Sequence, residues 1–264
     1  LGISARLALR RLQSDRIDPR PFLKRSRVSL HDLTAKKRIS AVAQIEFLNE
    51  VAAATKDEFI GMNLAESYDL RELGMLYYVT ASSNTLHEAL RRLTRYSRLG
   101  NEGIYGREKR GTACTIEFIF DGVQRFRDKQ QIEFLAVSLV RLCRQMLGRK
   151  IVPDSTSFIH YRRDDERSLD AWLGSDIRFG ATIDEMRFDP CLFDVPLVGQ
   201  DPYLNELMSK ACEEALAKRK VAVGPFRTTV ENAIAPLLPH GEANLRVVSG
   251  YLGLSERTFQ RRLV

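Results

Sequence analysis

The chain has 264 residues, of which 44% are hydrophobic and 28% are charged. This composition supplies enough apolar material for a core and excludes an intrinsically disordered chain. No apolar run approaches the ~18 residues of a membrane-spanning helix, and the N-terminal stretch lacks the features of a signal peptide. We therefore expect a cytoplasmic protein of one large domain or two ordinary ones, with no membrane partner.

The formal net charge of +7 is unevenly distributed along the chain. Residues 1–38 carry +8 and residues 218–264 carry +5, whereas residues 39–217 carry −6. Basic ends suit a polyanion, because Lys and Arg displace the counterions condensed on phosphates. The N-terminal run has a second interpretation as the solvated face of helices, and the sequence leaves both open.

Four cysteines are widely separated in the sequence. None pairs with another Cys or with His at the spacing of a metal site. We therefore expect reduced thiols, with no metal and no cofactor.

Helices are predicted over the first 55 residues, in pieces. Leucines at helical spacing place the first one before Pro19. A second follows from Phe22 to Leu33, and a third runs from Ile39 to Ala54. The apolar stripe of the third is formed by Val42, Ile45, Leu48 and Val51.

Helices and short strands then mix. Thr85, or alternatively Asn84, can cap a helix that turns its leucines inward. The further predicted elements are a strand at 111–121, a helix at 130–147, a strand at 155–163, a helix at 168–173, strands at 177–179 and 185–188, and a helix at 201–217. Because no regular β-α-β repeat occurs, this pattern favours an α+β fold.

A boundary is predicted near residues 217–228, where a basic run meets the breaker Gly224-Pro225. We expect an effector-binding and dimerisation domain at 1–217 and a linker at 218–227. An all-α DNA-binding domain, only partly present, would occupy 228–264 and begin with a helix from Thr228 to Leu237.

Residues 245–264, LRVVSGYLGLSERTFQRRLV, have the layout of a helix-turn-helix. Gly253 is placed to end one helix in the left-handed region, and Ser255 is placed to cap the next. Phe259 and Leu263 lie four residues apart and are expected to anchor the second helix inward. The apolar side chains that lie at helical spacing in the first helix are Val247, Val248, Tyr251 and Leu252.

The outward residues of the second helix are basic or amide-bearing: Arg257, Gln260, Arg261 and Arg262. Arg and Gln pair with the edges of guanine and adenine in the major groove, so Arg257, Gln260 and Arg261 are the candidate base contacts. The candidate phosphate contacts are Ser255, Thr258 and Arg246. Any capped amphipathic helix pair shares the spacing, so an ordinary structural role stays open.

The segment GLSERTFQRRL resembles the first helix-turn-helix of the AraC/XylS family of bacterial transcription regulators. The residues that carry the resemblance are Gly253, Leu254, Ser255, Thr258, Phe259, Gln260, Arg261 and Leu263. Residues 74–99 and 175–197, with the helix after Asp201-Pro202, resemble the arabinose-binding-type effector and dimerisation domain of one branch of that family.

The resemblance implies a DNA-binding regulator that responds to a small-molecule effector and forms a homodimer, and it leaves RNA polymerase open as a further partner. The effector, its pocket residues, the operator and the sign of regulation stay open. The family's DNA-binding domain has two helix-turn-helix units, whereas this sequence stops at Val264, inside the first recognition helix. We therefore expect the sequence to lack the second unit.

No nucleophile elbow, phosphate-binding loop or zinc-protease motif occurs in the sequence. His160 is interpreted as a satisfied buried residue or a ligand contact, and Trp172 as a core anchor or a pocket wall. Tyr77, Tyr78 and Tyr96 are expected mainly to pack, with effector contact as the alternative. The acidic cluster Asp164-Asp165-Glu166 is expected to be solvated, with a cation site as the alternative. The alternatives to a regulator are an enzyme built on residues 39–217 and a basic module that binds nucleic acid, protein or membrane surface without specificity. We expect no enzyme.

Overall fold

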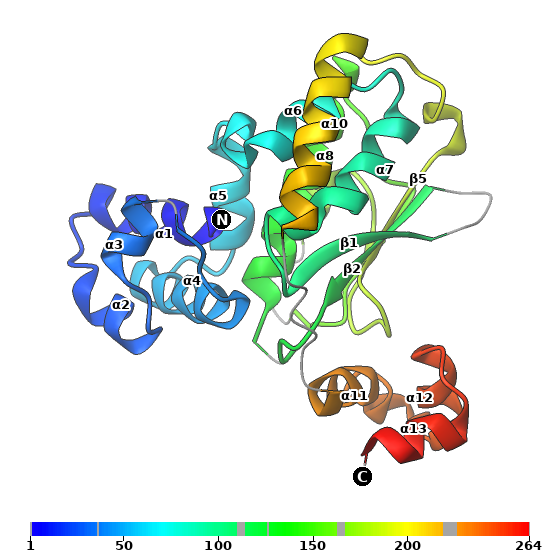
Figure 1. Ribbon diagram of the computed structural model, residues 1–264. Helices are drawn as coiled ribbons and strands as arrows, with labels where there is room; N and C mark the ends of the chain where they lie inside the picture. Colours follow the sequence, from blue (N-terminus) through cyan, green and yellow to red (C-terminus); the bar gives the residue numbers. More distant parts are fainter. Residues whose placement is uncertain are drawn as a thin grey trace.

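The computed structural model describes residues 2–35, 37–109, 114–125, 127–162, 167–218 and 226–263. The chain begins with a cluster of five helices, seen on the left of Figure 1. They are α1 (Ile3–Ser14), α2 (Arg20–Arg25), α3 (Leu30–Thr34), α4 (Ala41–Thr55) and α5 (Ile60–Ser67). The single helix predicted from Phe22 to Leu33 is wrong. Its backbone breaks between α2 and α3, where Arg27 takes a φ of 54°.

A second group of helices lies beside the long helix α8 (Lys129–Leu147). This group contains the short 3-10 helix η1 (Leu70–Leu73), α6 (Met75–Ala81), α7 (Leu86–Tyr96), η2 (Ser97–Leu99), α9 (Arg167–Leu173), η3 (Pro190–Leu192) and α10 (Pro202–Ala217). Helix α8 packs on α5, and α10 packs on α6. The predicted Thr85 cap is confirmed, because its hydroxyl accepts a hydrogen bond from the Glu88 amide, and Asp201 at the start of α10 accepts one from Leu204.

The strands form one five-stranded sheet in the order β1-β2-β5-β3-β4. Their bounds are β1 (Ile104–Lys109), β2 (Cys114–Phe120), β3 (Ser155–Ser157), β4 (Ile177–Arg178) and β5 (Glu185–Phe188). All neighbours are antiparallel except β3 and β4. A mixed sheet covered by helices agrees with the predicted α+β class.

One predicted strand is too long, and one strand was missed. The strand expected at 155–163 ends at Ser157, because the Ile159 amide leaves the sheet and donates to the Asp184 carboxylate. Strand β1 was not predicted, since Arg107, Glu108 and Lys109 hide its alternation. Residues 111–113 of the other predicted strand lie outside the described residues, as do residues 219–225 of the predicted linker.

The body, residues 2–218, contains one large apolar core that joins the N-terminal helices, α8 and the sheet. The last four helices form a separate small core. These are α11 (Phe226–Ile234), η4 (Leu238–His240), α12 (Leu245–Tyr251) and α13 (Glu256–Leu263), and we call residues 226–263 the C-terminal unit. The unit lies below one end of the sheet in Figure 1.

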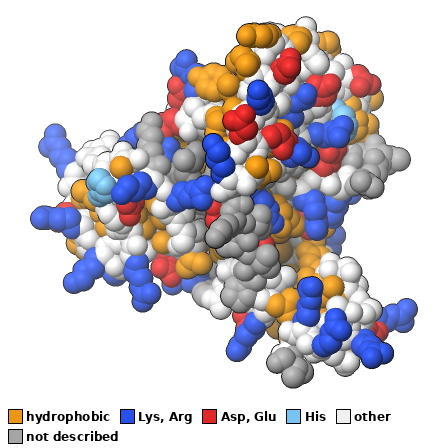
Figure 2. All heavy atoms as spheres, viewed as in Figure 1, with side chains coloured by type: hydrophobic (Ala, Val, Ile, Leu, Met, Phe, Trp, Pro, Cys, Tyr) orange, Lys and Arg blue, Asp and Glu red, His pale blue; other side chains and the backbone are white. Residues whose placement is uncertain are grey.

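Basic side chains surround both ends of the molecule, as Figure 2 shows for the N-terminal helices and the lower lobe. At the N-terminal end several of them are engaged: Arg10 pairs with Glu72, Arg25 with Glu50 and Arg38 with Glu102. These pairs favour the interpretation of the N-terminal run as a solvated, ion-paired face. Among the described residues, no helix has the length and apolar character needed to cross a membrane.

Candidate functional site

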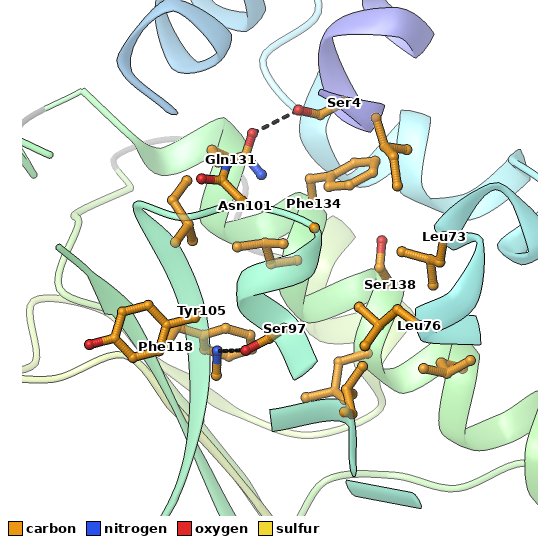
Figure 3. Close-up of a pocket in the computed structure, with 18 of the residues that line it drawn as sticks. Ser4, Leu73, Leu76, Ser97, Asn101, Tyr105, Phe118, Gln131, Phe134 and Ser138 are labelled. Carbon is orange, nitrogen blue, oxygen red and sulfur yellow. Dashed lines mark hydrogen bonds between the residues drawn. The ribbon is translucent and has the colours of Figure 1, made fainter. Parts of the chain in front are cut away.

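A cavity of about 150 Å³ lies inside the body, between the sheet, α8 and the N-terminal helices (Figure 3). Strand β2 contributes Ile116 and Phe118 to its wall, and α8 contributes Phe134, Ser138 and Leu142. The opposite walls come from α7, η2 and the segment around Leu73 and Leu76. The wall is therefore assembled from segments that are far apart in the sequence.

A few polar groups interrupt the apolar wall. The Gln131 carboxamide oxygen accepts hydrogen bonds from the Ser4 hydroxyl at 2.7 Å and from the Gln44 amide at 2.8 Å. Among the described residues, no hydrogen-bond partner is found for the buried Gln44 Oε1, and the buried hydroxyls of Tyr68 and Ser138 have no partner beyond each other. Burial raises the pKa of the Tyr68 phenol, and the neighbouring Ser138 hydroxyl opposes that rise.

No charged side chain is among the described residues that line the cavity. Buried polar groups are normally hydrogen-bonded, and each one left unpaired costs about 1–3 kcal/mol. An apolar hollow with a few unsatisfied polar groups is the usual form of a small-molecule site. The cavity is therefore the candidate effector site.

A buried ionic cluster lies on the other side of α8. Glu133 accepts hydrogen bonds from His160 at 2.9 Å and from Arg162 Nε at 2.6 Å. Burial alone would raise the pKa of Glu133, but these two partners outweigh it and hold the pKa below its ordinary value. His160 is therefore paired through Nε2 alone, because no partner for its buried Nδ1 is found among the described residues, and both of its interpretations stay open.

The C-terminal unit is built around Phe259, which is only 4% exposed. Its ring contacts that of Phe226 edge-on, with 5.9 Å between centroids. Val230, Leu237 and Val248 complete the core. Three helices thereby bury their apolar faces against one another, which positions α13 with its opposite face outward.

The turn between α12 and α13 follows the predicted chemistry. Gly253 has a φ of +66°, a conformation that is free of steric cost only for glycine. The Leu254 amide donates to the carbonyl of buried Ser249 at 2.9 Å. Ser255 then accepts a hydrogen bond from the Thr258 amide at 3.3 Å and so caps α13.

The predicted base contacts Arg257, Gln260 and Arg261 are exposed on α13, and Arg246 is exposed on α12. No ion pair within the described part of the chain holds the guanidinium groups of Arg246, Arg257 or Arg261. Arg262 differs, because it lies over the Phe226 ring at 5.6 Å. Ser255 and Thr258 are engaged with each other, with 2.9 Å between their hydroxyl oxygens.

One predicted inward position is wrong. Leu263 is 49% exposed and does not belong to the small core, since α13 reaches past the helices that could cover it. Val247 and Tyr251 are also exposed, because only the Val248 side of α12 faces Phe259. Half of the Tyr251 side chain is covered beside the sheet, and this partial burial first and the Glu117 carboxylate second raise its pKa to about 12.

A direct contact joins the C-terminal unit to the sheet. The Asn232 carboxamide on α11 donates to the main-chain carbonyls of Phe120 at 3.3 Å and Val123 at 2.6 Å. Phe120 ends the strand whose Ile116 and Phe118 line the cavity. The candidate effector site and the C-terminal unit therefore share β2.

Residues 17–197 match the family described as the arabinose-binding domain of AraC transcription regulator, N-terminal. The chain belongs to this family. Its matched part contains the sheet, α8 and most of the cavity wall. The family is therefore shown by more than half of the sequence, and the predicted resemblance to AraC regulators is confirmed.

A solved structure of the transcriptional regulator CdpR from Pseudomonas aeruginosa is also similar. It shares 17% sequence identity with a TM-score of 0.53, over 93% of this chain and 76% of that one. At this identity the likeness shows the fold alone. A search of curated proteins gave no match. Both similarities are to transcription regulators rather than to enzymes.

The AraC-family match ends before the C-terminal unit, so the candidate DNA contacts stay predictions. The cavity residues were not predicted, because no local motif joins segments that meet only in the fold. One signal was present in the sequence, because a glycine such as Gly106 inside a strand often marks a close approach of another element. In the structure that element is α7, where a Cβ at Gly106 would lie 3.3 Å from Thr94.

The remaining candidate residues have packing roles. Trp172 lies partly buried under the Arg144 guanidinium, 4.6 Å from the ring centroid, and Tyr96 is buried with its hydroxyl 2.6 Å from Glu213. Tyr77 accepts a hydrogen bond from Gln145, and Tyr78 is partly exposed. The acidic cluster at 164–166 lies outside the described residues. Within the described ranges, no group of three His, Cys, Asp or Glu side chains is placed to hold a metal ion.

Proposed function

We propose that this AraC-family chain is a sequence-specific DNA-binding transcription regulator whose affinity for DNA depends on a small molecule held in the body cavity. The domains would be an effector-binding and dimerisation domain at 1–217, a linker at 218–227 and the first helix-turn-helix from 228. The observation that carries the proposal is the exposed face of α13. Arg257, Gln260 and Arg261 share that face, opposite the buried Phe259.

This face has the chemistry of a groove reader. A helix fixed by one apolar anchor can enter the major groove, where Arg pairs with guanine and Gln with adenine. Ser255, Thr258 and Arg246 flank it at positions suited to phosphate contacts. The guanidinium groups of Arg246, Arg257 and Arg261 support the proposal, because no carboxylate within the described residues has to be displaced from them before DNA binds.

The proposed coupling is a population shift between arrangements of the C-terminal unit on the body. The Asn232 contact supports it, because it is made to the strand that also walls the cavity. An effector that prefers one arrangement changes the affinity for DNA, and DNA must change the affinity for the effector by the same factor. Equal effector affinity with and without DNA would count against this mechanism.

We also propose that the regulator is a homodimer, since helix-turn-helix proteins read paired half-sites. Tyr203 and Leu207 lie one turn apart on α10, and Tyr203 is 74% exposed. Figure 2 shows hydrophobic side chains gathered over this part of the molecule. Leu207→Asp should shift the protein toward monomer in sedimentation velocity, whereas the surface variant Lys24→Asp should not. Unchanged mass for Leu207→Asp would exclude this face.

Footprinting on the DNA upstream of the protein's own reading frame tests the function directly. The proposal expects a discrete protected segment with two half-sites about 10 base pairs apart, or a multiple of that spacing. Uniform, unlocalised protection would instead support the basic module that binds nucleic acid without specificity.

A further inference from the structure

We propose that the effector is a small, neutral, mostly apolar molecule with one or two hydrogen-bonding groups, such as an aromatic alcohol, and not a sugar or a carboxylate. This inference rests on the proposed function, because it names the ligand class of the same cavity. It departs from the family's name, which refers to arabinose.

The described wall of the cavity carries no charge. The side chains that line the cavity are apolar, hydroxyl-bearing or amide-bearing, and no Lys, Arg, Asp, Glu or His is among them. An ion transferred into such a wall would lose its hydration without gaining a partner, and that penalty is large. Carboxylates, phosphates and ammonium compounds are therefore poor occupants.

The wall offers a ligand few polar atoms for hydrogen bonding. Gln131 Oε1 is already used by Ser4 and Gln44. Among the fully buried polar atoms of the described wall, Gln44 Oε1 has no partner and can only accept, and the Tyr68 and Ser138 hydroxyls have only each other. A pentose brings a hydroxyl on nearly every carbon, and most of these would be left unpaired beside Leu, Ile and Phe side chains. One or two polar groups on the ligand match the wall.

Size and shape limit the ligand as well. The cavity volume is about 150 Å³, and an apolar cavity of about this volume accepts a ligand of the size of benzene. Phe118 from β2 and Phe134 from α8 line it, and Figure 3 shows Ser138 on α8 between Phe134, Leu73 and Leu76. A single ring with one hydroxyl could place the ring among the apolar groups and its oxygen near Ser138.

The test is a binding assay on the whole chain without DNA. Benzyl alcohol, toluene, benzoate and L-arabinose are the probes, and calorimetry with ligand-observed NMR is the readout. We expect benzyl alcohol to bind at least tenfold more tightly than benzoate and arabinose. Tighter binding of benzoate or arabinose, or no binding of any probe, would overturn the inference.

Two variants locate the binding. Ser138→Ala should weaken benzyl alcohol about tenfold, the effect of one lost hydrogen bond, and leave toluene unchanged. Leu93→Trp places a larger ring at a partly buried wall position and should abolish binding of both, whereas Leu238→Trp, on the exposed surface of the C-terminal unit, should not. If Leu93→Trp does not fold, Ser138→Ala alone decides: equal weakening of both probes, or of neither, contradicts the inference.

This assay and the footprint can fail separately. Probe binding without a footprint would support the proposed ligand class and contradict the proposed function as a transcription regulator. A footprint with no binding of the neutral probes would leave the regulator standing and remove the ligand class.

Discussion

Asn232 on α11 donates a hydrogen bond of 2.6 Å to the main-chain carbonyl of Val123, just beyond the end of β2. The same carboxamide reaches Phe120 on that strand. Phe118 and Ile116, which line the cavity, lie two and four residues before Phe120. The cavity wall and the contact with the C-terminal unit are thus separated by only a few residues of one strand, so a displacement of β2 at the cavity would also displace the acceptor of Asn232.

Asn232→Ala should loosen the C-terminal unit from the sheet. Loss of two hydrogen bonds to main-chain carbonyls is worth about 1–3 kcal/mol, so amide hydrogens of α11 should exchange faster by roughly one to two orders of magnitude. Hydrogen exchange with mass spectrometry measures this. Arg227→Ala on the same helix breaks only an exposed pair with Glu231 and serves as the control. Equal exchange in the two variants would mean that the contact does not hold the unit.

Phe259→Ala should unfold the C-terminal unit while the body stays folded. Truncating this buried ring removes the centre of the small core and costs about 3–5 kcal/mol. Leu263→Ala is the matched control, and because Leu263 is half exposed it should cost less than about 1 kcal/mol. Urea denaturation, monitored by hydrogen exchange in α11–α13, distinguishes the two variants. A large loss of unfolding free energy in Leu263→Ala would mean that Leu263 faces inward, as its spacing predicted.

Glu133→Gln should destabilise the body and flatten its response to acid. The folded pKa of Glu133 lies below its unfolded value of about 4.3. Its ionised form therefore adds stability above that unfolded value, and this stability is lost as the pH falls through the folded pKa. Breaking the pair also leaves Arg162 buried without its partner, which costs about 3–5 kcal/mol at neutral pH.

Urea unfolding between pH 3 and 7, followed by the fluorescence of Trp172, measures both effects. Glu102→Gln is the control, because its pair with Arg38 is exposed and worth about 0–1 kcal/mol. A variant as stable as the native protein at pH 7, with the same acid transition, would show that the cluster does not carry this dependence.

Arg261→Ala should cost about 1–3 kcal/mol on the specific DNA site and little on random DNA, because a base contact carries sequence information. Arg227→Ala, whose side chain belongs to α11, is the control for lost charge. Equal losses on specific and random DNA would identify Arg261 as a phosphate contact instead.

The local features of this molecule could be predicted because they depend on near neighbours in the chain. Asp201, Ser255 and Gly253 act on residues within one turn, and each has the role expected from its type. The Leu263 prediction was wrong for the opposite reason. Helical spacing says which residues share a face, but not how far the covering helices extend.

The cavity is a nonlocal feature and was not predicted. Ser138 and Gln131 resemble ordinary polar positions on a buried helix, and only packing against β2 and the N-terminal helices places them in one wall. Strand β1 escaped prediction because its charged residues make ion pairs, such as Arg107 with Glu117 and Lys109 with Glu185, that no alternation pattern shows.

Fluorescence anisotropy of the protein on its own upstream DNA and on a scrambled duplex, at two salt concentrations, tests the central claim most directly. The account predicts a preference of ~10³-fold or more for its own DNA that persists at the higher salt. Equal, steeply salt-dependent binding to both duplexes would contradict it and would leave only a basic surface.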